Sequence, residues 1–451
     1  MGKKIKVLVI GLILTMMTAS TVFADTTREE HEGNGLDLLL KSGDTMEQVE
    51  QAISQISPDI TLSWIPEIAC IHLELPASVD KEEIISHERI RPFISAKGNL
   101  PDISAPLNPL NSIDLNNVAA VGDSRFRSQM TDEELFDAMA WHVDEITDHR
   151  MSLDIAKGDG ARIALIDSGV DVEHPILKGK INMEDSCSYV SDEVGIADYH
   201  GHGTGVAGIL TQVAPQAEIT VYKVIGEETG ESDWTIRAVI QAANDGNHII
   251  NMSLGTYKCE DVESELLTIE AFQRAIEYAQ TKNCIVVASA GNKSLDLDQY
   301  YETEHKKHLP GGVEQCITVS SVMENALASY SNFGMNIDLC APGGDLVYVD
   351  GALDLSKWIY CLYPTNKDNG LSSLDVPQGY SFSYGTSFAA PAVSAGLADI
   401  LSYYIEKGQD VSMNQIMEDM MRGAEDIGAV GKDIYFGVGE VQLYQSLHTL
   451  K

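Results

Sequence analysis

Three residues that are far apart in the chain carry the functional groups needed to activate a serine nucleophile: Asp167, His202 and Ser387. A serine hydroxyl is a weak nucleophile at neutral pH until a base accepts its proton. An imidazole has the pKa that this base requires, and a buried carboxylate fixes its tautomer and stabilises the imidazolium that forms. The set predicts acyl transfer through a serine, with Asp167 orienting His202 and His202 acting as the base.

Each of these residues has a more ordinary explanation when it is taken alone. Asp167 could simply end a strand, Ser387 could cap a helix, and His200 competes with His202 for the role of base. The segments around them favour catalysis: Ala-Leu-Ile-Asp-Ser-Gly, His-Gly-Thr-Gly-Val-Ala-Gly and Gly-Thr-Ser-Phe-Ala-Ala-Pro. Together, in the order Asp, His, Ser, they resemble the signatures of the subtilisin-like serine proteases, the subtilases.

A fourth polar residue, Asn292, follows a strand-like run and is preceded by Ala-Gly. Acyl transfer builds negative charge on a carbonyl oxygen, and donors must already point at that oxygen. Alone, Asn292 would be a turn residue after glycine. Beside the triad, its side-chain amide and the backbone N–H of Ser387 are predicted to form the oxyanion hole.

Two further segments resemble the substrate-binding parts of subtilases. Ser253, Leu254 and Gly255 correspond to the segment that pairs with the backbone of an extended peptide. The resemblance implies that Ser289, Ala290 and Gly291 form the opposite wall of the pocket for the residue before the scissile bond.

A basic cluster lies close to these segments in an otherwise acidic chain. Its members are Lys293, His305, Lys306, Lys307 and His308. One hypothesis is that they accept an acidic side chain before the scissile bond through ion pairing in a partly desolvated pocket. The alternative is a solvated basic loop.

The elements that must position these residues form an alternating pattern. Apolar strand-like runs lie at 163–166, 219–224, 248–252, 285–288 and 317–319, and helical patterns lie between them at 203–212, 235–244 and 266–281. Strands that are apolar throughout and separated by helices predict an α/β fold, with a mainly parallel central sheet covered by helices on both faces. We assign a subtilisin-like catalytic domain to 136–451, with the site where strands end and helices begin.

A small separate unit is predicted at 36–97. Strands at 36–41, 60–65, 68–75 and 90–94 and helices at 44–56 and 81–88 give the order β-α-β-β-α-β, which is ferredoxin-like α+β. Subtilases commonly carry an N-terminal propeptide of this fold. The resemblance implies that this unit helps the catalytic domain to fold and acts as an intramolecular inhibitor.

Segments on either side of that unit predict export and processing. Residues 1–24 combine an early basic stretch, a short apolar run and small residues at the cleavage position, which is typical of a signal peptide. A short N-terminal segment at 25–35 follows. Residues 98–135 contain several prolines and read as a linker with an autoprocessing site between Lys97 and Gly122. That region offers Asp102 and Asp114 but no Glu.

Charge and composition limit the partners and cofactors that we expect. The net charge of −38 disfavours nucleic acid and anionic membranes as partners. After the first 24 residues we find no further apolar run long enough to predict a membrane span. The connection after the His202 helix, at 208–215, is too short for the calcium loop of many secreted subtilases. We expect no metal or other cofactor there, although a weaker calcium site elsewhere stays possible. Among seven cysteines, Cys284 and Cys316 are predicted to be buried thiols.

The features together are most similar to secreted leader peptidases of lanthipeptide (lantibiotic) gene clusters. This looser resemblance covers 136–445 and implies removal of the leader from a modified lanthipeptide precursor. Two alternatives stay open: a general degradative extracellular subtilase, and an inactive subtilase fold that only binds peptide. The stretch from Pro342 to Gly385 is longer than in a minimal subtilase, and either lines the substrate cleft or covers surface.

Overall fold

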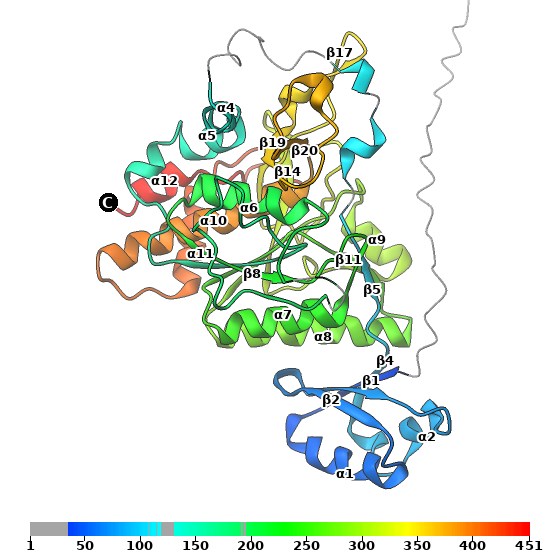
Figure 1. Ribbon diagram of the computed structural model, residues 1–451. Helices are drawn as coiled ribbons and strands as arrows, with labels where there is room; N and C mark the ends of the chain where they lie inside the picture. Colours follow the sequence, from blue (N-terminus) through cyan, green and yellow to red (C-terminus); the bar gives the residue numbers. More distant parts are fainter. Residues whose placement is uncertain (1–34, 107, 114, 119–129, 191–192, 194) are drawn as a thin grey trace, which may run out of the picture.

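The computed structural model describes residues 35–106, 108–113, 115–118, 130–190, 193 and 195–451. These residues form a larger α/β unit and a small N-terminal unit, drawn in blue at the bottom of Figure 1. The predicted signal peptide at 1–24 lies outside the described residues, as do residues 25–34 of the short segment that follows.

The larger unit is built on an eight-stranded sheet in which β14 (Cys316–Met323) also pairs with β16 (Leu339–Pro342). All its pairings are parallel except that of β14 with β15. The other strands, in spatial order, are β15 (Ala326–Leu327), then β14, β12 (Ile285–Ser289), β10 (Ile249–Met252), β6 (Arg162–Asp167), β8 (Glu218–Lys223) and β7 (Cys187–Ser188).

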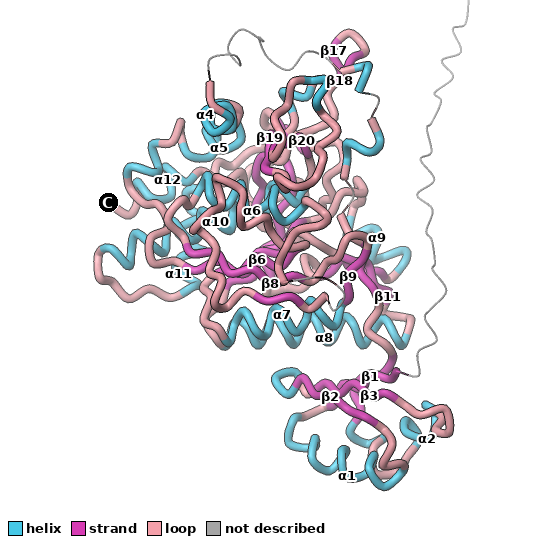
Figure 2. The backbone as a smooth tube through the Cα atoms, viewed as in Figure 1, coloured by secondary structure: helices cyan, strands magenta, loops and turns pink. Residues whose placement is uncertain are grey.

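Helices cover both faces of this sheet (Figure 2). Successive side chains of a strand point to opposite sides, so each strand contributes to two cores. Ile163 and Leu165 of β6 join one core, together with residues of α6 (His202–Val213) and α10 (Thr386–Glu406). Ala164 and Ile166 join the other core, with residues of α7 (Ser232–Asn244) and α8 (Glu263–Thr281). The predicted fold class is confirmed.

Helix α10 runs through the middle of the first core. It is the one described helix that is long and apolar enough to cross a membrane, but 89% of its apolar window is buried inside the fold. Helices α11 (Met413–Gly423), α12 (Leu443–His448) and α5 (Trp141–Thr147) pack around it or beside α6. α10 therefore serves as a core helix that carries Ser387 at its first turn.

The N-terminal unit has a four-stranded antiparallel sheet with the spatial order β2-β3-β1-β4. Its elements are β1 (Gly35–Leu40), α1 (Met46–Ile56), β2 (Thr61–Ile65), β3 (Cys70–Glu74), α2 (Lys81–Ser86) and β4 (Ile94–Gly98). One predicted strand boundary was wrong. The last strand begins at Ile94 and not at Ile90, because Arg91–Phe93 form a 3-10 turn with Pro92 in it.

One face of this small sheet packs on α7 and α8, which lie directly above it in Figure 1. Leu39, Ile65 and Cys70 belong to the same buried cluster as residues of both helices. Arg274 of α8 donates from Nη1 to the carbonyl oxygens of Leu40 (2.6 Å) and Ile68 (3.1 Å). An apolar face and a cationic clamp therefore hold the two units together.

The segment predicted as a plain linker, 98–135, contains regular structure. β5 (Asp102–Ser104) pairs with β9 (Thr229–Glu231), and short 3-10 helices η4 (Pro109–Ser112) and η5 (Leu115–Asn117) follow. Helix α4 (Asp132–Ala138) begins before the predicted end of the linker, because Thr131 and Glu134 form a capping box. The domain boundary at 135/136 therefore falls inside a helix.

The stretch 342–385 forms a lobe that packs on α6 and lies in the upper part of Figure 1. It contains the hairpin β17 (Tyr348–Val349) and β18 (Ala352–Leu353), and the antiparallel pair β19 (Ile359–Leu362) and β20 (Tyr380–Ser383). Trp358 and Tyr360 are buried in it. β20 leads directly into Gly385 and the first turn of α10.

A first prediction concerns the cationic clamp. Arg274→Ala, made in a chain that also carries Ser387→Ala, removes two charge-assisted hydrogen bonds, each of which is worth about 1.5–3 kcal/mol when fully formed. We expect the N-terminal unit to detach more readily, with at least tenfold faster cleavage by added trypsin between the two units. Arg89→Ala is the control, because Arg89 contacts Gln55 within the small unit. Equal cleavage rates for both variants would refute the clamp.

Candidate active site

The carboxylate of Asp167 and the imidazole of His202 are joined at the edge of the sheet. Asp167 ends β6 with no exposed surface, and His202 opens α6 and is 8% exposed. His202 Nδ1 lies 2.8 Å from Asp167 Oδ1 and 3.0 Å from Oδ2. This geometry holds the ring so that Nε2 is left to exchange a proton with a nucleophile.

The turn that presents His202 is organised by a second buried carboxylate, Asp198. It accepts hydrogen bonds from the Ser168 hydroxyl (2.9 Å), the Gly201 N–H (2.7 Å) and both the N–H and the hydroxyl of Thr204. Gly203 is required here, since a Cβ at that position would lie 2.2 Å from the Gly169 carbonyl oxygen. The loop therefore brings α6 directly against the end of β6.

The competition between His200 and His202 is resolved by Asp167. His200 Nδ1 is buried and has no hydrogen-bond partner in the described part of the chain. Burial, followed by the neighbouring His202, lowers the pKa of His200. His202 alone has the geometry of an oriented base.

Ser387 lies in the first turn of α10, where it is 8% exposed. Its hydroxyl donates to the Ser253 carbonyl oxygen at 3.1 Å, while His202 Nε2 has no hydrogen-bond partner among the residues described. The ring of His202 packs against Phe388, the next residue of the helix, with centroids 5.7 Å apart. Catalysis thus requires the Ser387 hydroxyl to rotate from Ser253 to His202, a tightening that is common when substrate binds.

The electrostatic surroundings favour the protonated form of His202. Burial lowers its pKa, but the charge and the hydrogen bond of Asp167, with a contribution from Asp198, more than offset this and raise the pKa above its ordinary value of 6.5. A base with a raised pKa accepts the serine proton more readily and keeps the resulting imidazolium stable.

Asn292 is exposed beside the nucleophile and is oriented by Thr386. Asn292 Oδ1 accepts from the backbone N–H (2.9 Å) and the hydroxyl (2.7 Å) of Thr386. With its oxygen engaged in this way, its Nδ2 is the group left to donate to a carbonyl oxygen held near Ser387. The part played by Thr386 was not predicted from the sequence, although this residue stands next to the predicted nucleophile.

The segment Ser253-Leu254-Gly255 follows β10 and is joined to α10 by buried hydrogen bonds. Ser253 Oγ donates to the Ser387 carbonyl oxygen (2.8 Å) and accepts from Asn251 Nδ2 (3.1 Å), and Ser394 Oγ donates to Asn251 Oδ1 (2.8 Å). This buried chain of hydrogen bonds couples the strand that would bind substrate to the helix that carries the nucleophile.

The imidazole of His308 lies between the two predicted pocket walls. A Cβ on Gly255 would come within 2.5 Å of His308 Nε2, and one on Gly291 within 3.3 Å. Ser289 and Ala290 are buried behind Gly291. Burial, together with the charge of Lys293, lowers the pKa of His308 to about 4. His308 is therefore neutral at physiological pH, and we call the predicted pocket between the two walls, beside the His308 ring, the slot.

The five basic residues do not converge on this slot. Lys293 lies with Nζ 4.6 Å from the ring centroid of Tyr257, and that ring packs on His308. The other three lie at or beside β13 (Lys306–Leu309), which pairs with β11 (Thr256–Cys259). His305 pairs with Asp261, Lys307 pairs with Glu260, and Lys306 stacks on Tyr300. His305, Lys306 and Lys307 are neighbours of His308 in sequence but contact groups of their own, and their part in the pocket stays a prediction.

Metal binding is not evident from the described side chains, since no three His, Cys, Asp or Glu residues come together as a candidate site among them. The connection after α6 is short, with β8 beginning at Glu218. The expectation about calcium stays a prediction. All seven cysteines are free, and Cys284 and Cys316 are buried.

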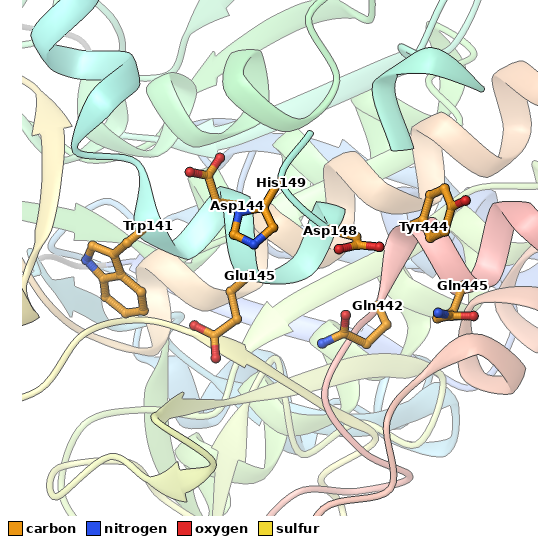
Figure 3. A pocket seen from close by; sticks show the side chains of 8 residues that line it. All are labelled: Trp141, Asp144, Glu145, Asp148, His149, Gln442, Tyr444 and Gln445. Carbon is orange, nitrogen blue, oxygen red and sulfur yellow. The ribbon is translucent and has the colours of Figure 1, made fainter. Parts of the chain in front are cut away.

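A separate cavity of about 620 Å³ contains no member of the triad. Its side chains come from α5 and the segment around α12, and Figure 3 shows acidic and amide groups facing one another across it. The lining residues are Trp141, Asp144, Glu145, Asp148, His149, Gln442, Tyr444 and Gln445. Asp144 is already paired with Arg150. No nucleophile and base meet there, so the triad cleft is the candidate active site.

The geometry agrees with comparisons to known proteins. The model of the subtilase family of peptidases matches residues 158–439, which span Asp167, His202, Asn292 and Ser387. The chain belongs to the subtilase family. This subtilase is accordingly a serine endopeptidase, and the reading of an inactive, peptide-binding fold is set aside.

Two of its relatives act on leader peptides according to their names. The subtilase is 31% identical to the epidermin leader peptide-processing serine protease of Staphylococcus epidermidis, over 70% of this chain and 75% of that protein. Its sequence is 37% identical to that of a lanthipeptide protease of known crystal structure. The two structures have a TM-score of 0.66, and the match covers 68% of this chain and 94% of that one. The epidermin protease of Staphylococcus aureus shares the fold over 93% of this chain, with 24% identity and a TM-score of 0.72.

The raised pKa of His202 gives a testable pH dependence. Only neutral His202 can accept the serine proton, so kcat/KM should fall as the pH drops through a value above 6.5. In Asp167→Asn the burial of His202 remains but the favourable charge is gone. We expect the acidic limb to move to lower pH and kcat to fall by about 10⁴. An acidic limb that stays in place in this variant would contradict the assignment.

The oxyanion assignment gives a second test. Asn292→Ala should lower kcat by about 10²–10³, because the donor acts on charge that develops in the transition state. KM should change little. Ser294→Ala is a nearby control, since the Ser294 hydroxyl donates to the Ser329 carbonyl oxygen. A rise in KM with unchanged kcat would assign Asn292 to substrate binding instead.

Proposed function

We propose that this subtilase is a secreted serine endopeptidase, made as a self-processing zymogen, that removes the leader from a lanthipeptide precursor. Asp167 orients His202, His202 takes the proton of Ser387, and Asn292 with the Ser387 N–H receives the oxyanion. The lanthipeptide protease with 37% identity is the main support for this substrate class. The predicted signal peptide supports secretion.

The observation that carries the zymogen proposal is an extended segment of the chain's own linker at the cleft. Ile103 pairs antiparallel with Gly230 of β9, the Ala105 N–H donates to the Glu228 carbonyl oxygen at 3.4 Å, and Pro106 is hydrogen-bonded to the ring of His200. Main-chain pairing of this kind is how an extended peptide is bound. In this proposal the N-terminal unit, clamped on α7 and α8, holds the segment there as an intramolecular inhibitor.

The position of His308 beside Gly255 and Gly291, with Lys293 nearby, supports a preference for an acidic residue before the scissile bond. A carboxylate that enters the slot would meet the His308 ring and approach the Lys293 ammonium in a partly desolvated place, where charge-assisted hydrogen bonds are strong. The space beside Gly255 and Gly291 is taken up by the His308 ring and the Tyr257 hydroxyl, which would disfavour an aromatic side chain there. A pocket of this kind distinguishes a dedicated processing enzyme from a degradative one.

Self-processing is tested by expressing the wild-type chain beside Ser387→Ala. The wild-type chain should be cut between Lys97 and Gly122, and the variant should stay whole, because the same serine performs both reactions. Mass spectrometry of the two products locates the cut. Identical fragments from both chains would mean that another protease does the processing.

Pocket preference is tested with peptides that differ only in the residue before the bond. We expect Glu to be cleaved at least tenfold better than Gln, and Lys293→Met to remove about tenfold of the kcat/KM for Glu, which is about 1.4 kcal/mol. The matched control is Lys307→Met, since Lys307 is paired with Glu260. Equal losses in the two variants, or efficient cleavage at many unrelated residues, would favour the degradative alternative.

A further inference from the structure

The linker does not end at the triad but continues onto the lobe formed by 342–385. Beyond Pro106, η4 lies against β20, the strand that leads into Ser387. Farther along, Asn117 Nδ2 donates to the Gly351 carbonyl oxygen at 3.0 Å, and Val118 forms a parallel bridge with Leu353 of β18. In Figure 1 these linker segments lie beside β17.

The contacts of this second part are mainly apolar. Leu110, Ile113, Leu115 and Val118 are partly buried, and they pack against the large core that includes Leu353 and Phe382. At the tip of the hairpin, Tyr348 and Val349 are 59% and 50% exposed. The lobe therefore offers an apolar surface that the linker covers in part and that extends beyond it.

The linker passes the site in one direction. The chain first pairs with β9, then passes His200 next to the catalytic base, and then follows β20 and the β17–β18 hairpin. A substrate that runs the same way has its leader on the β9 side. The part released by the cut then lies on the lobe.

We propose that the lobe 342–385, with the hairpin β17–β18, is a docking surface for the part of the peptide substrate on the carboxyl side of the scissile bond. Its occupant is an extended segment with apolar residues spaced as in 110–118, and in the intact chain the linker takes its place. This inference rests on the proposed function, in which the carboxyl side is the modified peptide itself. The lobe thereby selects precursors by the product they will release.

Direct binding tests the surface independently of catalysis. The full chain carrying Ser387→Ala is titrated with a labelled synthetic peptide of residues 108–118, and binding is followed by fluorescence anisotropy. Leu115→Ser with Val118→Ser weakens the contact of the linker with the lobe. The Ser387→Ala chain that carries these two substitutions should therefore bind the peptide at least tenfold more tightly than the Ser387→Ala chain that lacks them. Val262→Ser with Val430→Ser is the matched control, because both valines are exposed elsewhere. Equal affinity in all three chains would overturn the proposal.

Cleavage tests whether substrate uses the surface. Three peptides share one leader sequence: the first ends in a chromophore at the scissile bond, the second continues with apolar residues at the linker spacing, and the third has serines in their place. Tyr348→Ser with Val349→Ser should lower kcat/KM about tenfold for the second peptide, equivalent to about 1.4 kcal/mol. It should leave the first and third unchanged.

The outcomes separate the two proposals. Equal kcat/KM for the second and third peptides with the unaltered enzyme would refute substrate docking on the lobe, even if the linker peptide binds. A loss for all three peptides in the hairpin variant would also refute it, because the defect would then lie in the triad. If no peptide is cleaved by the unaltered enzyme, the proposed function fails, and the binding experiment alone decides whether the lobe is a docking surface.

Discussion

The hydrogen bond between the buried carboxylate of Asp167 and His202 Nδ1 is the interaction on which the site depends. It fixes the tautomer of the imidazole, raises its pKa against the opposing effect of burial, and leaves Nε2 facing the first turn of α10. The sheet places one partner at the end of β6, and the turn organised by Asp198 places the other at the start of α6. Because both carboxylates are buried, the loss of either leaves unpaired donors inside the protein, so the geometry and the stability of this edge are linked.

Much of this arrangement could be predicted from the sequence, since it depends on local patterns. Apolar runs such as 163–166 and 285–288 had to be parallel strands covered on both faces, and parallel strands bring their carboxyl ends to one edge. Asp167, Asn292 and Ser387 lie at the ends of such elements, so their convergence was predictable from the sequence. The choice of His202 over His200 came from its glycine-rich surroundings, and the contact with Asp167 agrees with it.

What the sequence could not supply were contacts between segments that share no pattern. The basic residues 305–308 are adjacent in the chain, but alternate residues of β13 point to opposite sides, so His308 enters the slot while Lys307 pairs with Glu260. The linker read as irregular because prolines obscure periodicity, although Ile103 and Val118 each pair with distant backbone. The hydrogen bond from the Ser387 hydroxyl to Ser253 depends on a rotamer, which no sequence motif encodes.

Labelling of the enzyme with a serine-directed fluorophosphonate, followed by mass-spectrometric mapping of the adduct, tests this triad most directly. The reagent phosphonylates a serine only when a neighbouring base removes its proton. We expect a single adduct on Ser387 that disappears in His202→Ala and persists in His200→Ala. An adduct on another serine, or labelling of Ser387 that does not depend on His202, would contradict it.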